Sequence, residues 1–475
     1  MHRVVRTGVA LAAPFFWLFL VASVAISHEP LRVGAAAVDI TPPVGFRMSG
    51  YFYERSSTGT HDPLQAKAIV WQQGDVRFAW VFCDMLGITS EVTNVARTKS
   101  AEATGIPREN IFIAATHSHT GPLLFGPLKD FFHEAAVKKN GSDPLQFAEY
   151  AADLPNKLVA AVQKAAAGMA PVDVAAGMCL QPGLAFNRRF FMSDGTVKTN
   201  PGKLNKNIDR PAGPTDPQVG LLEFRRSGQP FAGLTVFALH CDTTGGTEYS
   251  ADYPFYLGQV LRTKFGPHYF SVFGAGTCGD VNHIDVSHGR SQKGVEEASR
   301  IGDALGKTVA AALESLPTIE HPRLAHASKT LQVPVQRYTA EEVAAARAKL
   351  PKVGTREIPM LDQVAAVKIV WISDWGTTAR AMDVQVFRLS DSVALVALPG
   401  ELFVEFGLAI KQSSPFATTL VVELSNDYPG YIPTKRGFVE GSYEPTNSRI
   451  ESGGGEMLVD AARELLKQLH DAPTK

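Results

Sequence analysis

The sequence predicts an α/β to α+β fold in which a mixed β-sheet core is flanked by helices. Short apolar runs rich in β-branched residues alternate along the chain with Ala-rich segments whose apolar residues recur at helical spacing. No internal repeat and no low-complexity tract breaks this alternation. The pattern therefore favours sheets with helices packed on their faces.

The expected elements can be located in chain order. The predicted strands are Ala68–Trp71, Phe78–Asp84, Ile111–Ala115, Val219–Phe224, Leu234–Leu239, Phe270–Phe273, Met382–Leu389, Val393–Leu398 and Thr419–Glu423. The predicted helices are Phe147–Ala167, Pro254–Lys264, Val295–Leu316, Ala340–Leu350, Val404–Gln412 and Glu456–Leu469. Thr339 and Glu342 form a capping-box pattern. Residues 200–217, rich in Pro, Gly, Asn and Lys, predict a long surface loop.

The N-terminus has the features of an export signal. Arg3 and Arg6 precede an apolar run that ends in the small-residue pattern Ala25-Ile26-Ser27. Residues 1–27 are therefore predicted to be a signal peptide that is removed, with a membrane anchor as the alternative. Cleavage implies an extracytoplasmic location, either secreted or periplasmic.

Length and charge limit the classes of function. The chain has 475 residues and a formal net charge of −1, with acidic and basic residues interleaved. This length favours an enzyme over a small binding module, and the charge gives no support for a nucleic-acid partner. No obligate protein partner is evident. We expect one catalytic domain over residues 31–470, with a weak sub-boundary near 316–334.

The cysteines do not indicate a disulfide-dense or zinc-thiolate protein. There are four of them, and none lies in a CxxC pair. Cys241 and Cys278 each adjoin a segment of the expected active site. Export permits a disulfide between them, and buried free thiols are the alternative.

The segment Ile111–Pro122 places two histidines at the end of an apolar strand. His117 and His119 are two residues apart, so on an extended chain both imidazoles face the same side. Neutral imidazole is a common zinc ligand. The pattern indicates a metal site, although structural histidines at a strand end would produce it too.

Two further strand ends carry similar groups. The run Leu234–Leu239 delivers His240, and the run Val393–Leu398 is followed by Pro-Gly and then Glu401. For Glu401 the alternative is a carboxylate that caps the next helix. A Gly-rich loop over residues 273–283 would bring backbone amides close to a ligand, and it lacks the phosphate-binding motifs GxxxxGK[ST] and GxGxxG.

Taken together and in order, these motifs resemble the neutral/alkaline non-lysosomal ceramidases. The resemblance spans roughly residues 31–450. The matching segments are Val33–Pro42, Thr116–Pro122 (like THTHSGP), Asn187-Arg188 (like NR), Phe237–His240 (like FAVH), Gly279–Asn282 (like GDVS), Leu398–Glu401 (like LPGE) and Asn426–Tyr431 with Tyr443 (like NxYxxY…RYE).

The resemblance implies a set of zinc ligands and catalytic groups. The positions that correspond to the family's Zn²⁺ ligands are His117, His240, Glu401 and Tyr431, which leaves Tyr428 as a packing aromatic. His119, Arg188 and Tyr443 are implied as active-site residues outside the ligand set. His119 would carry a proton, and Arg188 with Tyr443 would stabilise an oxyanion. A surface salt bridge is the alternative role for Arg188.

The sequence departs from the family pattern at the proposed nucleophile. Asn282 stands where the family has a serine, so attack by zinc-bound water is the expected chemistry. Asn282 is expected to hydrogen-bond the substrate, and Asp280 to orient a ligand histidine or Arg188. Cys278 or Thr277 as a replacement nucleophile is the alternative. The chain is expected to be a short form that lacks the family's C-terminal β-sandwich.

The sequence thus predicts an exported zinc-dependent amidohydrolase that is ceramidase-like. Its implied substrate is N-acylsphingosine or another N-acyl lipid amide, met in solution or at a membrane surface and cleaved to a fatty acid and an amine. The alternatives are a zinc hydrolase of esters or of non-lipid amides, and a metal- or lipid-binding homologue without catalysis.

Overall fold

The structure, a computed structural model, describes residue 2 and residues 29–145 and 148–472. Apart from residue 2, the predicted signal peptide over 1–27 lies outside these residues. Within the described part of the chain, no helix combines the length and apolar character needed to cross a membrane.

The described residues form three main sheets. The first has the order β5-β4-β3-β1-β6, with β1 (Arg32–Asp39), β3 (Gln65–Gln73), β4 (Val76–Cys83), β5 (Ile111–Ala115) and β6 (Ala170–Pro171). The second has the order β15-β13-β12-β7, with β7 (Asp173–Leu180), β12 (Gln218–Arg226), β13 (Gln229–Phe237) and β15 (Phe270–Ala275). The third has the order β17-β18-β19-β21, with β17 (Ala325–Pro334), β18 (Ala379–Arg388), β19 (Val393–Ala397) and β21 (Thr418–Val422).

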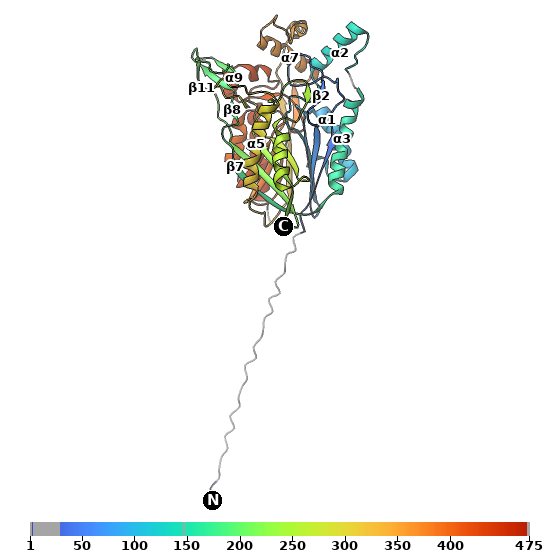
Figure 1. The fold of residues 1–475 in the computed structure, drawn as a ribbon, viewed down its shortest axis with the longest axis vertical. Coiled ribbons are helices and arrows are strands. Elements are labelled where there is room, and N and C mark those ends of the chain that lie inside the picture. Colours follow the sequence, from blue (N-terminus) through green and yellow to red (C-terminus); the bar gives the residue numbers. More distant parts are fainter. Residues whose placement is uncertain (1, 3–28, 146–147, 473–475) are drawn as a thin grey trace.

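Each sheet has helices packed on one face. The first sheet contacts α1 (Ser90–Thr104) and α3 (Ala148–Ala167), the second contacts α4 (Tyr253–Phe265) and α5 (Val295–Leu313), and the third contacts α8 (Val404–Ser413) and α11 (Gly454–Asp471). Figure 1 shows α3 along one side of the molecule, with strands of the first sheet, drawn in blue, beside it. The mixed sheets with flanking helices confirm the predicted fold class.

The three sheets share one apolar cluster on their inner faces. Alternate residues of β3 and β4 point to opposite sides, so Trp71 and Trp80 enter this cluster while Val70 and Val81 face α3. The ring centroids of Trp80 and of Phe387 in β18 are 5.6 Å apart, and Trp80 also contacts the rings of Trp71 and Phe112. Aromatic rings therefore join the first and third sheets.

Replacing Trp80 with alanine is expected to destabilise the protein by about 3–5 kcal/mol, because a fully buried ring would leave a cavity where the sheets meet. Guanidinium unfolding followed by circular dichroism measures this loss. Val439→Ala is the control, because Val439 is 90% exposed and its truncation should change the free energy of unfolding by less than about 0.5 kcal/mol. Equal midpoints for the two variants would contradict the assigned core.

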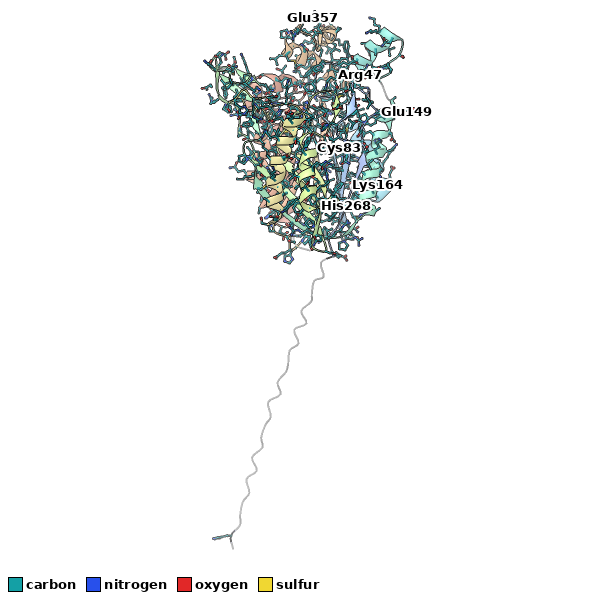
Figure 2. All side chains as sticks on the ribbon, viewed as in Figure 1. Arg47, Cys83, Glu149, Lys164, His268 and Glu357 are labelled. Atoms are coloured by element: carbon teal, nitrogen blue, oxygen red, sulfur yellow. The ribbon has the colours of Figure 1, made fainter. Side chains whose placement is uncertain are left out.

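Smaller elements gather at one end of the molecule. The helices α2 (Pro127–Asn140) and α7 (Met360–Trp375) lie at the end opposite the C-terminus, near α9 (Lys435–Glu440) and β11 (Ile208–Pro211) (Figure 1). Glu357, between α6 (Ala340–Lys349) and α7, marks this end, and His268, between α4 and β15, marks the other (Figure 2). The remaining short elements are β2 (Gly59–Thr60), β8 (Phe186–Asn187), β9 (Arg189–Met192), β10 (Val197–Thr199), β14 (Glu248–Tyr249), β16 (Val281–Asn282), β20 (Glu401–Leu402), β22 (Tyr431–Ile432), α10 (Tyr443–Asn447), η1 (Arg108–Asn110) and η2 (Leu350–Lys352).

The predicted strands and helices all correspond to observed elements, and the capping box of Thr339 and Glu342 is present. One expectation needs correction. The segment 200–217 is not entirely loop, because it contains β11, which pairs with β9 in a small sheet. All four cysteines are free, and Cys241 and Cys278 are buried thiols, as one of the two interpretations of the sequence had it.

Candidate metal centre and active site

The candidate metal ligands come from all three main sheets. His117 follows β5, His240 follows β13, and Glu401 follows β19, so each main sheet delivers one of these side chains from the end of a strand. All three are buried. His117 has a φ of 71°, a left-handed conformation that is uncommon for a residue with a Cβ.

The three side chains meet at short distances, together with His119. The carboxylate Oε2 of Glu401 lies 3.3 Å from Nε2 of His117 and 3.5 Å from Nε2 of His240. Nε2 of His119 lies 3.3 Å from Nε2 of His117. Ligand atoms of His117, His119 and His240 all lie within 4.8 Å of one another. His119, which was expected to lie outside the ligand set, therefore belongs to the group that could hold a metal ion.

The hydrogen bonds of the two HxH imidazoles fix their tautomers. Nδ1 of His117 is 2.8 Å from the carbonyl oxygen of Leu86, and Nδ1 of His119 is 3.1 Å from that of Gly50. A carbonyl can only accept, so both Nδ1 atoms carry the proton and both Nε2 atoms present lone pairs. Two lone pairs 3.3 Å apart, beside a carboxylate, repel one another unless a cation lies between them.

The spacing of these atoms fits a zinc ion. Four ligands at about 2.0–2.1 Å from a tetrahedral centre stand about 3.3–3.4 Å apart, close to the separations seen here. Oε2 of Glu401 is buried and has no hydrogen-bond partner among the described residues, which is the state expected of an oxygen reserved for a metal.

Glu401 does not cap the helix that follows it. The first backbone N–H of α8, that of Val404, donates to Oδ1 of Asp280 at 2.8 Å. The other oxygen of Glu401, Oε1, accepts the phenol hydrogen of Tyr428 at 2.7 Å. Tyr428 is therefore more than the packing aromatic that the sequence suggested, because its hydroxyl orients the carboxylate.

Tyr431 is brought beside Glu401 by backbone pairing. β20 and β22 run parallel, with Glu401 opposite Tyr431. The ring of Tyr431 is buried and lies 5.5 Å from that of Tyr443 and 5.3 Å from the guanidinium carbon of Arg188. Burial raises the pKa of Tyr443 to about 12, so at neutral pH its phenol keeps the proton it would donate.

Arg188 is buried and directed at the cluster, so it is not a surface salt bridge. Its Nε donates to Glu444 at 2.8 Å, its Nη2 to the carbonyl of Gly279 at 2.7 Å, and its Nη1 to Nε2 of His240 at 3.1 Å. The neighbouring Arg189 instead donates to Glu440 and to the other oxygen of Glu444. Two of the three nitrogens of Arg188 thus hold the third against a candidate ligand.

The structure corrects the expected roles of Asp280 and Asn282. Asp280 bonds the backbone N–H of Val404 and the Asn187 amide rather than the side chain of a ligand histidine or of Arg188. Burial raises its pKa to about 6. The Asn282 amide donates to Asn200 and accepts from the backbone of Ile284, so its nitrogen and its oxygen both bond within the protein. Asn282 lines neither chamber of the site.

The alternative nucleophiles are also misplaced. Cys278 is buried with its thiol donating to Glu423, and burial raises its pKa well above the usual range. Neither Cys278 nor Thr277 lines a chamber of the site. Because a thiol acts as its thiolate, this cysteine is not an activated nucleophile.

Sequence reasoning missed Asp242. It follows His240 by two residues, the same spacing as His117 and His119, and it lines the larger chamber. Although burial alone would raise it, the bond to His283 holds the pKa of Asp242 well below its usual range. The repeated two-residue spacing could have identified it.

Two chambers meet at this cluster. The larger has a volume of about 920 Å³ and includes Arg188, Lys198 and Asp242 in its lining. The smaller has a volume of about 90 Å³ and is lined mainly by apolar side chains from α2, α7 and the segments around them. Both are bordered by the same set of residues beside the candidate ligands: Gly50, Tyr51, Phe52, His119, Tyr431 and Tyr443.

Fold and site together define a mixed-sheet protein with a buried histidine–carboxylate centre suited to a metal ion. Residues 31–249 match the family described as neutral/alkaline non-lysosomal ceramidase, N-terminal. The resemblance predicted from the motifs is confirmed over this part of the chain.

One relative and two solved structures are also similar to this chain. Neutral ceramidase A of Dictyostelium discoideum is 26% identical over 272 residues, which is 53% of this chain and 35% of that protein, so the match spans about a third of the relative's length. The crystal structure of neutral ceramidase from Pseudomonas aeruginosa superposes with a TM-score of 0.69 at 18% identity, covering 94% of this chain and 76% of that one. A ceramidase complexed with C2 superposes with the same TM-score at 17% identity, covering 94% and 77%.

Proposed function

We propose that the chain is an exported zinc-dependent hydrolase that cleaves the amide bond of N-acyl substrates. The observation that carries this proposal is the set of facing Nε2 lone pairs of His117 and His119 beside Glu401, at zinc-ligand spacing. The match of residues 31–249 to a ceramidase family supports an amide, and an N-acyl lipid in particular, as the substrate. Exposed apolar side chains at the larger chamber, among them Tyr53, Met360 and Leu361, suit a lipid or a membrane surface.

The ligand set that we propose is His117, His240, Glu401 and Tyr431, with His119 close enough to join it. Zinc held there would supply Lewis-acid polarisation of the substrate carbonyl and activation of water. Tyr428 keeps the Glu401 carboxylate in one orientation through its hydrogen bond.

The protein's own groups would then manage charge and protons. The guanidinium carbon of Arg188 lies 6.0 Å from the ring centroid of Tyr443, and both side chains would stabilise the oxyanion that forms when the carbonyl is attacked. His119 borders both chambers and would accept the proton from the attacking water and return it to the leaving amine. Water is the proposed nucleophile because Asn282, Cys278 and Thr277 do not line the chambers.

We further propose that residues 31–470 act as one catalytic unit. Two candidate ligands, His117 and His240, precede the weak boundary near 316–334, and Glu401 and Tyr431 follow it. A site that draws on both sides requires both parts to be docked.

The purified mature chain is expected to carry about one zinc per chain and to hydrolyse N-acyl amides, because the site presents one four-ligand cluster. Metal analysis and an assay panel of ceramide, short N-acyl amides and matched esters test this. Activity should be lost on chelation and return with zinc.

The panel also separates the alternatives. Turnover of esters without amides would replace the proposed reaction by ester hydrolysis. Bound zinc without turnover of any substrate would identify a binding protein, and full activity in metal-free protein would exclude the metal mechanism.

A further inference from the structure

The smaller chamber contains a buried positive charge among apolar walls. Its lining includes Phe125, Leu128, Val367 and Trp371, which suit a hydrocarbon group. The same chamber is lined by Arg449, whose side chain is not needed for the fold's hydrogen bonding. An apolar pocket with one convergent charged group is the usual form of a ligand site that selects for a charge.

Arg449 has no hydrogen-bond partner for its guanidinium within the described residues. It is 3% exposed and lies flat on the indole of Trp371, with its guanidinium carbon 3.5 Å from the ring centroid. Its Nε and Nη1 are both buried without a partner. The other buried arginines of the described chain all donate from the guanidinium: Arg47, Arg55, Arg97, Arg188, Arg189 and Arg388.

The surroundings of Arg449 do not neutralise it. Burial lowers its pKa to about 10, so it is still charged at neutral pH. The nearest cations, Lys368 of α7 and Arg380 of β18, add positive charge, and Arg380 is already paired with Asp427. Glu401 is the acidic group that faces it, and that carboxylate belongs to the proposed metal site. An unpaired buried cation is costly, so this arrangement is complete only with an anion in the chamber.

The volume of the chamber limits what that anion can be. A cavity of about 90 Å³ has about one tenth of the volume of the larger chamber, so it takes only a short group. A long acyl chain does not fit in this space and would have to lie in the larger chamber. A chain of a few carbons that ends in a carboxylate does fit.

We propose that the smaller chamber binds a short acyl group with a terminal carboxylate, which Arg449 recognises, so that the substrates are monoamides of short dicarboxylic acids. This inference rests on the proposed amide hydrolysis at the adjacent cluster. Water adds across the C–N bond, giving the dicarboxylate and the free amine. The larger chamber then takes the amine, with room for a long chain.

The test compares matched substrates with the zinc-loaded mature chain. N-glutaryl and N-pentanoyl amides of one chromogenic amine have acyl groups of similar length and differ in the terminal carboxylate. The wild-type protein is expected to favour the glutaryl amide in kcat/KM by roughly 10- to 100-fold, the value of a hydrogen bond to a charged group. Arg449→Gln should reduce this ratio to near one. Arg463→Gln, at an exposed arginine of α11, is the matched control and should leave the ratio unchanged.

Two measurements do not depend on turnover. Glutarate is expected to bind the wild-type protein at least tenfold more tightly than Arg449→Gln, measured by calorimetry. Without any ligand, Arg449→Met should raise the melting temperature, because it removes an unpaired buried charge while keeping much of the contact with Trp371. A structural arginine would give the opposite shift.

The outcomes separate this inference from the proposed function. The inference would be overturned if the two amides had equal kcat/KM and glutarate bound the wild type and Arg449→Gln equally well. The proposal of amide hydrolysis would be unaffected by that result. If no amide is cleaved but glutarate binding requires Arg449, the hydrolase proposal fails and the anion site is supported. A lower melting temperature in Arg449→Met would also overturn the inference.

Discussion

Replacing His117 with alanine is expected to reduce bound zinc to background and to lower the hydrolysis of N-acyl amides by more than about 100-fold. Mutating a residue that only hydrogen-bonds a metal ligand can already cost about 100-fold, and His117 is proposed as a ligand itself. His117 contributes to two of the three short separations in the cluster, those to Glu401 and to His119. Its removal leaves three of the four proposed ligands, His240, Glu401 and Tyr431, so the zinc shell is incomplete. Metal content and kcat/KM measured on the same sample test both effects.

The control for this substitution is His268→Ala. His268 is exposed and lies at the far end of the molecule from Glu357 (Figure 2). It should keep full zinc content and activity. If His117→Ala retained both as well, the site would have been assigned to the wrong residues.

Replacing Arg188 with glutamine is expected to lower kcat by about 100- to 1000-fold while the protein keeps its zinc, because the guanidinium would act on the developing oxyanion rather than on the metal. Arg188→Lys should restore little of the loss. A lysine cannot bond Glu444 and Gly279 and still direct a third nitrogen at the cluster, as the guanidinium does.

Arg210→Gln, at an exposed arginine of β11, serves as the matched control and should leave both kcat and zinc content unchanged. Thermal unfolding of each variant checks that a loss of kcat does not arise from unfolding. Loss of zinc in Arg188→Gln would show that Arg188 holds His240 in place instead of acting on the substrate.

The predicted strands and helices were located from hydrophobic periodicity, and two of the elements that were missed, α1 and β1, have weak patterns. In α1 the buried residues are Thr93, Ala96, Arg97 and Ser100, so the helix carries almost no apolar stripe. In β1 the run of small alanines resembles neither a strand nor a helix strongly. Tertiary packing, rather than local propensity, decides both.

The candidate site was located as three strand ends, but its details depend on contacts between distant segments. The pairing of β20 with β22 puts Tyr431 beside Glu401, and the Tyr428 hydroxyl reaches the same carboxylate. The sequence indicates that Asp280 and Asn282 lie in a polar loop near the site. It does not indicate where their side chains point, because that depends on the backbone conformation of the loop. Arg449 was not predicted as a site residue because it lies in no recognisable sequence motif.

The origin of the candidate ligands in three separate sheets has a thermodynamic consequence. A metal ion held by His117, His240 and Glu401 would bind only when all three sheets are docked on their common aromatic core. Its binding free energy would therefore be linked to the assembly of the whole molecule rather than to one loop. The zinc concentration would then determine the fraction of the protein that is folded, as well as the fraction that is catalytically active.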